Sequence, residues 1–219
     1  MPGIRITASD TAPMTRTDNR IYLASRSPRR RELLQQIGIA FEPLLLREDL
    51  RRGADVDEAA APGESPADYV IRIARAKAEA GWGRIAARRL LPHPVLAADT
   101  TVALDGEIIG KPADARCAHE FLRRLSGQTH QVLTAVAVAR ATRIETALSV
   151  SAVEFRELTD GEIRRYVASG EPLDKAGAYA IQGRAAVFVR AISGSYSGIM
   201  GLPLFETAEL LARFDVAPD

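Results

Sequence analysis

Apolar and polar positions alternate along this chain in blocks that predict both strands and helices. Short apolar runs bounded by polar residues or glycine are typical of buried strands. Such runs predict strands at residues 21–25, 41–46, 95–104, 132–139, 147–155 and 185–192. Apolar positions three and four residues apart predict helices at residues 28–37, 66–90, 114–125, from 159 onward, and 204–214. This alternation of elements predicts an α/β fold.

The middle strands follow one another with no helix between them. The turn Asp105-Gly106 predicts a hairpin after residues 95–104. Residues 132–139 are almost continuously apolar, as is typical of a strand inside a sheet. Because adjacent hairpin strands run antiparallel, we expect a mixed twisted sheet with flanking helices rather than a purely parallel one.

The chain shows neither an apolar leader nor a membrane-spanning run. Residues 1–20 are rich in Thr, Asp, Pro and Arg, which predicts a disordered extension before a single domain at 21–219. Residues 47–65 are charged and carry glycine and proline, which predicts a long loop. No apolar run approaches the roughly 18 residues of a membrane span. We therefore expect no membrane partner and a cytoplasmic protein.

Composition narrows the function classes. Of 219 residues, 47% are hydrophobic, which is enough for a substantial core, and 29 Lys and Arg nearly balance 28 Asp and Glu. Near-neutral charge argues against a general nucleic-acid binder, which usually carries a basic excess. Cys117 is the only cysteine, so an internal disulfide is impossible and we expect a small buried thiol.

Hydroxyl and guanidinium groups gather at residues 25–31, where the first predicted strand meets the first helix. Ser27 is placed to cap this helix, and Pro28 to begin it. A helix N-terminus offers unpaired backbone N–H groups and a positive dipole end, which suit phosphate. The alternative is a capped helix with a solvated basic face.

A carboxylate, Asp99, lies inside the apolar strand at residues 95–104. A buried carboxylate is costly unless it is paired or binds a metal, so Asp99 is a candidate site residue. Lys111 follows one hairpin later and could balance Asp99 or contact a phosphate. By itself Lys111 is more typical of a solvated surface position.

Glu58 lies in an acidic stretch at residues 55–58 and could hold Mg²⁺ together with Asp99. An acidic loop tip is more often simply solvated. Lys77 shares a face of the long predicted helix with apolar residues, so it either snorkels or points into a polar site. The three histidines lack zinc-ligand spacing, and we interpret His130 as structural.

Glycines are dense at residues 170–183, where they permit close backbone approach. Within this stretch Gln182 offers both a donor and an acceptor, which suits the edge of a nucleobase. Residues 194–203 form a second stretch rich in glycine and hydroxyls before the last helix. Ordinary turn chemistry explains that second stretch equally well.

Six stretches, in this order, resemble the Maf family of nucleotide pyrophosphatases. They are residues 23–30, 98–100, 110–112, 125–130, 174–183 and 201–204. The resemblance extends from residue 21 to about residue 214. It implies two lobes around a central cleft, like the fold of the inosine triphosphate pyrophosphatases. It also implies metal-dependent (Mg²⁺ or Mn²⁺) cleavage of a nucleoside triphosphate to the monophosphate and pyrophosphate, and a homodimer.

The resemblance also assigns roles to residues of this chain. Asp99 matches the family's catalytic carboxylate, which would hold the metal together with Glu58. The positions tied to substrate choice match Arg29, Thr100 and Gln182. Further active-site positions match Ser25, Arg30, Glu58, Lys77 and Lys111. We expect Arg29, Arg30, Lys77 and Lys111 to clamp the triphosphate, with Arg26 and Arg31 solvated.

Residues 178–183 look like the branch that acts on dTTP and UTP, and modified pyrimidine nucleotides could be further substrates of such a house-cleaning enzyme. The branch acting on 7-methyl-GTP differs in this stretch. Two departures are Ala180, where this branch often has glycine, and a longer loop at residues 47–64, which affects the placement of Glu58. A regulatory binding protein, linked to septum formation or nucleic acid, is the alternative from another functional class.

Overall fold

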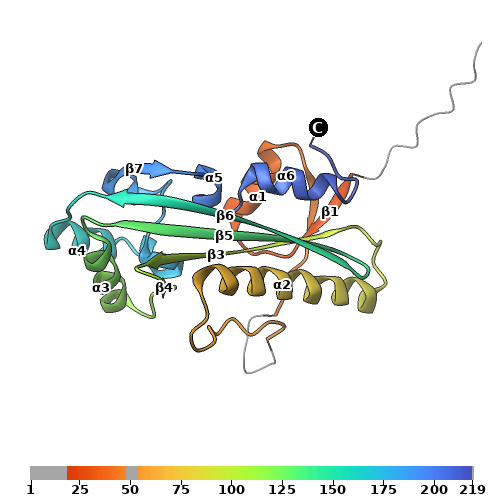
Figure 1. Ribbon diagram of the computed structural model, residues 1–219, viewed down its shortest axis with the longest axis horizontal. Helices are drawn as coiled ribbons and strands as arrows, with labels where there is room; N and C mark the ends of the chain where they lie inside the picture. Colours follow the sequence, from red (N-terminus) through yellow and green to blue (C-terminus); the bar gives the residue numbers. More distant parts are fainter. Residues whose placement is uncertain (1–18, 48–53, 219) are drawn as a thin grey trace, which may run out of the picture.

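A seven-stranded sheet runs along the whole length of the molecule in the computed structural model (Figure 1). The structure describes residues 19–47 and 54–218, so the predicted N-terminal extension falls almost entirely outside the described residues. The strands are β1 (Arg20–Leu23), β2 (Ala40–Pro43), β3 (Val95–Leu104), β4 (Glu107–Ile109), β5 (Thr129–Arg140), β6 (Arg143–Phe155) and β7 (Val189–Ser193). Their order is β2-β1-β3-β5-β6-β7, and β4 pairs with β3.

Strand directions confirm the predicted mixed sheet. β1 pairs in parallel with both β2 and β3, whereas β3, β4, β5, β6 and β7 pair antiparallel. The predicted β3–β4 hairpin is present, and Asp105 and Gly106 both adopt positive φ at its turn. β5 and β6 extend beyond their predicted bounds because backbone pairing continues through polar residues up to the turn at Ala141.

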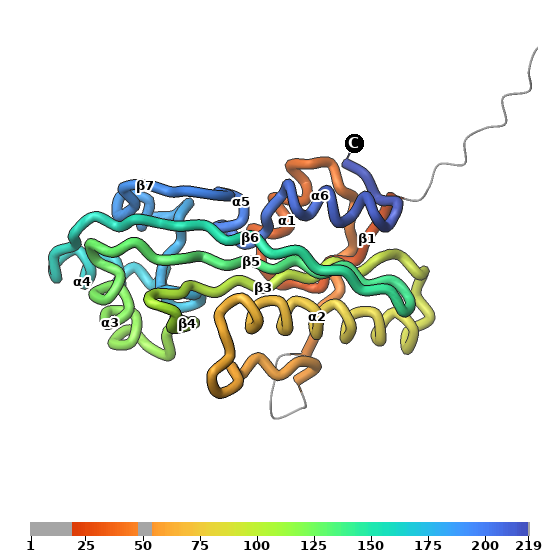
Figure 2. Tube along the Cα trace, viewed as in Figure 1, coloured from red at the N-terminus to blue at the C-terminus, as the bar shows by residue number. Residues whose placement is uncertain are grey.

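Helices cover both faces of the sheet. They are α1 (Pro28–Gln36), α2 (Pro66–Arg88), α3 (Ala115–Leu125), α4 (Asp160–Ala168), α5 (Tyr196–Met200) and α6 (Leu204–Ala212). α2 lies along one face, and α1 and α6 lie on the other face (Figures 1 and 2). The pleat of β3 explains this arrangement, since Leu96 packs in the core beneath α1 and α6 whereas Val95 packs beneath α2.

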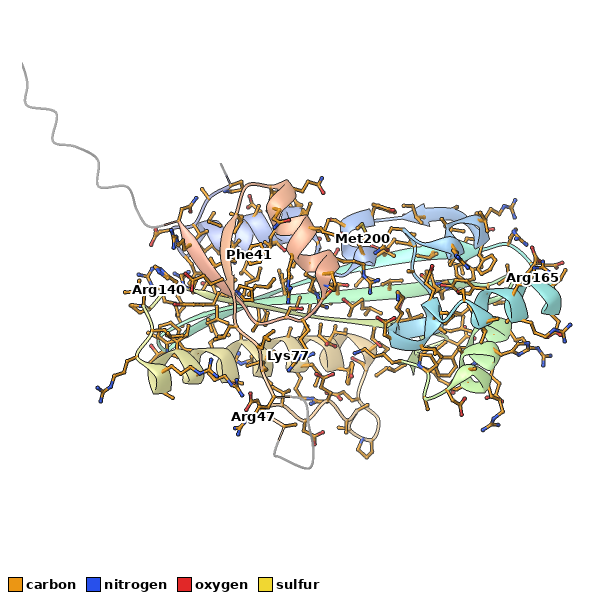
Figure 3. All side chains as sticks on the ribbon, turned by 180° about the vertical axis from the view of Figure 1, so that it is seen from behind. Phe41, Arg47, Lys77, Arg140, Arg165 and Met200 are labelled. Carbon is orange, nitrogen blue, oxygen red and sulfur yellow. The ribbon has the colours of Figure 1, made fainter. Side chains whose placement is uncertain are left out.

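A separate core at the far end of the sheet forms the second lobe. Leu122 of α3 and Ile163 of α4 pack there with Phe155 at the end of β6. Short 3-10 helices complete this lobe at Glu171–Asp174, Ala176–Ala178 and Arg184–Phe188. Lys77 and Met200 lie near the middle of the molecule, between Arg140 at one end and Arg165 at the other (Figure 3).

Helix ends follow the sequence signals closely. Thr159 and Glu162 form the capping box expected from their spacing, and Gly38 adopts positive φ just beyond α1. Ser27 occupies the N-cap position of α1 and Pro28 its first position, although the Ser27 side chain makes no capping bond. None of the helices within residues 19–47 and 54–218 has the length and apolar character needed to cross a bilayer.

Three expectations about local structure are wrong. Residues 184–188 form a 3-10 helix rather than the start of a strand, because the two side chains that pack in the core, Ala185 and Phe188, are three positions apart. β2 ends at Pro43 because its partner β1 ends at Leu23, with a last bond from the Leu44 N–H to the Leu23 carbonyl at 2.9 Å. Cys117 is only half-buried, since it lies in the first turn of α3.

Candidate active site

A cleft of about 690 Å³ lies between the two lobes. A ligand pocket of this size is typical for a small molecule such as a nucleotide. Every site residue predicted from the sequence lines this cleft, namely Ser25, Arg29, Arg30, Glu58, Lys77, Asp99, Thr100, Lys111 and Gln182. They come from α1, α2, β3 and the loops between elements. The fold thus brings together residues that are up to 157 positions apart, from Ser25 to Gln182.

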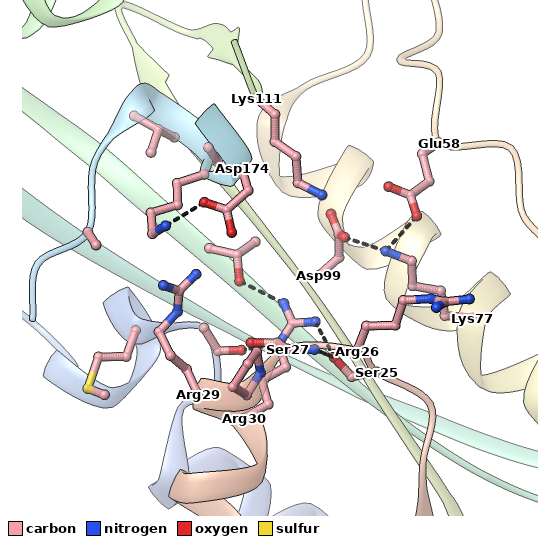
Figure 4. A pocket seen from close by; sticks show the side chains of 18 of the residues that line it. Ser25, Arg26, Ser27, Arg29, Arg30, Glu58, Lys77, Asp99, Lys111 and Asp174 are labelled. Atoms are coloured by element: carbon pink, nitrogen blue, oxygen red, sulfur yellow. Dashed lines mark hydrogen bonds and ion pairs between the residues drawn. The ribbon is translucent and has the colours of Figure 1, made fainter. Parts of the chain in front are cut away.

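The strand-to-helix junction after β1 forms one wall of the cleft. Ser25 is buried, and its hydroxyl oxygen accepts a hydrogen bond from the backbone N–H of Ser27 at 3.2 Å. Arg29 lies on the first turn of α1 and extends across the cleft toward Asp174 (Figure 4). Arg26 is exposed and donates to the Leu46 carbonyl, whereas the Nε of Arg31 is buried.

Arg30 is held by the protein itself. Its Nε donates to the Gly201 carbonyl at 2.7 Å, and its Nη1 donates to the Ala98 carbonyl at 2.9 Å and to Ser25 Oγ at 3.2 Å. Its Nη2 donates to Thr100 Oγ1 at 3.2 Å. Burial lowers the pKa of Arg30, and the nearby Asp99 charge opposes this effect. Four bonds to protein atoms leave few of its five N–H groups for a phosphate.

A chain of hydroxyls continues from Arg30 behind the cleft wall. Thr134 Oγ1 lies 2.9 Å from Thr100 Oγ1 and 2.8 Å from the Gly198 carbonyl oxygen. A carbonyl only accepts, so the single Thr134 hydroxyl proton goes to Gly198. Thr100 therefore supplies the proton between the two hydroxyls and accepts from Arg30. The Thr100 oxygen is left with a lone pair, and no proton, for a ligand in the cleft.

Two carboxylates in the cleft share one ammonium group. Lys77 Nζ lies 2.8 Å from Asp99 Oδ1 and 2.8 Å from Glu58 Oε1 (Figure 4). Asp99 is only 8% exposed, so the Lys77 ion pair provides the compensation that burial of its charge requires. Lys111 extends toward Asp99 from the opposite side in the same view.

The loop that carries Glu58 is anchored on α2. The Tyr69 hydroxyl donates to the Glu58 carbonyl at 3.1 Å, and Arg72 donates to the Ala59 carbonyl at 2.9 Å. Arg72 also pairs with Glu64 at 2.6 Å, which lowers the pKa of that carboxyl to about 2. Burial, followed by the Asp99 and Glu58 charges, raises the pKa of Tyr69 to about 12. These contacts direct Glu58 into the cleft.

The second lobe supplies the opposite wall. Lys175 Nζ donates to the Glu171 carbonyl at 2.8 Å and bonds the Asp174 carboxylate. Burial disfavours ionisation of Asp174, yet its hydrogen bond to Lys175 and the charges of Lys175 and Arg29 lower its pKa. Gly177 has a φ of +69°, and a Cβ there would lie 2.7 Å from a methyl of Val102. A glycine is therefore required where this wall meets β3.

Gln182 is exposed at the rim of the opposite wall, within the turn at residues 181–183. Beneath this wall Tyr179 is buried, and its hydroxyl lies 2.8 Å from Nε2 of His130. Burial lowers the pKa of His130 to about 4, so its ring is neutral at pH 7. His130 is structural here, as its sequence context predicted, because it lies behind the cleft wall.

The sequence did not single out Asp174 and Lys175 as site residues, although both line the cleft. The signal available was their position in the glycine-dense stretch at residues 170–183. The apolar floor at Val102, Val132 and Ile199 carried no signal, because apolar residues in strands and helices are typical of any core.

Comparison with known proteins identifies the family. The model of the family described as Maf-like protein matches residues 20–214. This chain belongs to the Maf family. A protein of Aromatoleum aromaticum named dTTP/UTP pyrophosphatase is 61% identical over 196 residues, covering 89% of this chain and 95% of the relative. A protein of the same name from Nitrosomonas europaea is 60% identical, covering 93% and 99%.

Similarity to solved structures is weaker. The Staphylococcus aureus Ham1 protein covers 89% of this chain and 97% of its own, with 16% identity and a TM-score of 0.47.

Proposed function

We propose that this Maf protein hydrolyses dTTP and UTP to the nucleoside monophosphate and pyrophosphate. The observation that supports this most directly is the cleft in which Asp99, Glu58 and Lys77 meet, with Arg29 and Lys111 nearby. Clustered cations suit a triphosphate, and a buried carboxylate beside them suits activation of water. Relatives of 54–61% identity that carry the name dTTP/UTP pyrophosphatase support the same proposal.

The roles within the cleft follow from geometry and charge. Arg29 and Lys111 bind phosphate oxygens, because within residues 19–47 and 54–218 neither is held by several protein acceptors as Arg30 is. Lys77 releases one of its carboxylates and contacts the triphosphate, while Asp99 orients the attacking water and accepts its proton. Water attacks the α-phosphorus, the bond to the bridging oxygen breaks, and pyrophosphate leaves. Arg30 keeps Ser25 and Thr100 in place.

A divalent metal ion fits this cleft. Glu58 and Asp99 direct their oxygens at one position that is already filled by a cation, the Lys77 ammonium. Two carboxylates suit Mg²⁺ or Mn²⁺ when phosphate oxygens and water complete the shell. The described residues contain no cluster of three His, Cys, Asp or Glu side chains that could hold a metal alone. When bound, the ion would neutralise charge on the phosphates.

Gln182 reads the pyrimidine in this proposal. It is exposed at the cleft rim and has both donor and acceptor groups for an imide edge. A single methyl group is worth only about 1–3 kcal/mol of discrimination, so thymine and uracil are both accepted. Modified pyrimidine triphosphates fit the same reasoning and would make this a house-cleaning enzyme. A cytoplasmic location and a homodimer stay predictions within this proposal.

A panel of canonical and modified triphosphates, assayed for pyrophosphate release, tests the proposal. We expect dTTP and UTP to be hydrolysed with kcat/KM values within about a hundredfold of each other. Equal turnover of GTP would overturn the assignment of pyrimidine substrates. A preference for 7-methyl-GTP would show that the chain belongs to the branch acting on that nucleotide. The nucleic-acid alternative has less support, because Arg30 is already held by four hydrogen bonds to protein atoms and is unavailable to a phosphate backbone.

A further inference from the structure

The carboxylate of Glu171 forms hydrogen bonds beside the turn that carries Gln182. Glu171 begins the 3-10 helix Glu171–Asp174 and lies outside the set of cleft-lining residues. Its two oxygens accept from the backbone N–H of Arg184, at 3.0 Å for Oε1 and 3.2 Å for Oε2. The bond therefore attaches the chain just beyond the turn at residues 181–183 to a separate segment of the lobe.

Tyr166 links the same carboxylate to the other side of this turn. Its hydroxyl donates to Glu171 Oε1 at 2.9 Å and accepts from the backbone N–H of Ala180 at 3.3 Å. Tyr166 is buried on α4, and burial, followed by the Glu171 bond, raises the pKa of its phenol. The carboxylate thus holds Arg184 directly and Ala180 through Tyr166, with Gln182 midway between them.

Gly183 shows how closely the carboxylate approaches this turn. A Cβ added at Gly183 would lie 2.2 Å from Glu171 Oε1, inside any permitted contact distance. The backbone of Gly183 has φ −101° and ψ −154°, a conformation open to any residue. A side chain at this position would therefore have to displace the Glu171 carboxylate, although the backbone itself would accept it.

We propose that Glu171 is a positioning residue for nucleobase selection. It fixes the turn at residues 181–183 so that the Gln182 amide meets the base at the distance and angle a hydrogen bond needs. The inference rests on the proposed function, since it concerns the same cleft. Glu171 does not contact Asp99 or Lys77, so it influences which base is bound and leaves hydrolysis itself unchanged.

The chemistry of the carboxylate distinguishes positioning from simple packing. An ionised carboxylate only accepts, and both groups that face it, the Tyr166 hydroxyl and the Arg184 N–H, donate. A glutamine would keep the shape but could turn an NH₂ group toward one of these donors. The turn would then lose a hydrogen bond without gaining a cavity.

The first test compares Glu171→Gln with the parent, using UTP, CTP and GTP as substrates. We expect KM for UTP to rise about tenfold, as for loss of one hydrogen bond at the base, and the UTP-over-GTP ratio of kcat/KM to fall about tenfold. The kcat should change by less than about threefold. Glu157→Gln, an exposed residue of the loop before α4, is the matched control and should match the parent.

A double-mutant cycle supplies the second test, because it compares the same substitution with and without the Glu171 carboxylate. Gly183→Ala in the parent places a methyl against Glu171 and should reduce UTP selectivity as strongly as Glu171→Gln does. In a Glu171→Ala background the methyl has room, so Gly183→Ala should add less than about twofold. Tyr166→Phe should have a smaller effect, because the bond to Arg184 remains.

The outcomes separate this inference from the proposed function. If the parent releases pyrophosphate from no nucleotide, the proposed function fails and the inference fails with it. If the parent hydrolyses UTP but Glu171→Gln lowers kcat equally for all three substrates with KM unchanged, only the inference is overturned. Additive effects of Gly183→Ala in the two backgrounds would also overturn it.

Discussion

The two walls of the cleft differ in where their polar side chains make contacts. On the wall formed by α1, α2 and β3, charged side chains bind one another, as Lys77 does with Asp99 and Glu58. On the wall formed by residues 171–184, the Asp174–Lys175 ion pair also lines the cleft, but the contacts of Glu171 and Tyr166 lie behind the surface, and Gln182 projects from it. The first wall must exchange ion-pair partners when a ligand binds, whereas the second wall is already arranged.

This difference follows from the physical chemistry of the two ligand parts. A triphosphate carries several negative charges, and unpaired charges in a partly buried cleft are costly. The cations and carboxylates of the first wall therefore pair with one another until the triphosphate binds. A base is neutral and is distinguished by the geometry of its hydrogen bonds. A fixed amide therefore serves selection better than a mobile one.

Asp99→Asn gives the largest effect, and it affects only the charged wall. The substitution keeps the side-chain shape but removes the charge that pairs with Lys77 and accepts the proton. We expect pyrophosphate release to fall by about 10²–10⁴-fold, with base preference unchanged. Asp105→Asn, at the exposed β3–β4 turn, is the control. Release at the parent rate with Mg²⁺ or Mn²⁺ would show that Asp99 is not catalytic.

Acid should weaken the second wall through His130. Burial disfavours the charged ring and lowers its pKa from the ordinary 6.5 to about 4 in the folded protein. The stabilisation is fully present above pH 6.5 and is lost as pH falls toward 4, at most about 3 kcal/mol. Urea unfolding from pH 7.5 to 4.5 measures this loss, which should be smaller in His130→Gln.

His119 provides the matched control for this pH series. It lies on α3 and pairs with Asp160 at 2.7 Å near the surface. His119→Gln leaves His130 in place and should therefore retain the acid-dependent loss that His130 contributes. If the parent and His130→Gln lose stability in parallel as pH falls, the contribution assigned to His130 is wrong.

Lys77→Met tests whether the charged wall exchanges partners. Without the ammonium, Asp99 and Glu58 face each other uncompensated, so kcat/KM should fall about 10–100-fold through lost phosphate contact. Mn²⁺ should bind more tightly in the absence of nucleotide, because the competing cation is gone, and calorimetry measures this. Arg75→Met on the exposed side of α2 should change neither quantity. Unchanged Mn²⁺ affinity would argue that Lys77 does not occupy the metal position.

Thr134→Val is expected to have the smallest effect. The valine cannot accept from Thr100, so the Thr100 hydroxyl is free to donate into the cleft. UTP offers a donor at N3 and CTP an acceptor, so the UTP-over-CTP ratio of kcat/KM should fall by about threefold. Thr134→Ser restores the hydroxyl and should restore the ratio. Equal ratios in the parent and both variants would exclude a role for this hydroxyl chain.

Much of the fold was predictable because its signals are local. Alternating apolar blocks predicted the core strands and most helices, and the Thr159 capping box needs only four consecutive residues. The strand predicted at residues 185–192 was wrong in its first half, since an apolar run of that length suits a 3-10 turn equally well. The site residues carried chemical signals too, from hydroxyls at a helix start to a carboxylate in an apolar strand.

The sequence by itself determined which charged residues and glycines the chain carries, and with them the family resemblance. These signals sufficed to predict nine residues, all of which line the cleft. Tertiary structure alone decided which of these side chains bind other protein groups and which face the cleft. It bound Arg30 to Gly201 and Ala98, placed Lys77 between two carboxylates, and set Glu171 behind Gln182. Arg30 and Gly201 are 171 residues apart and meet only after folding, so no local pattern encodes their hydrogen bond.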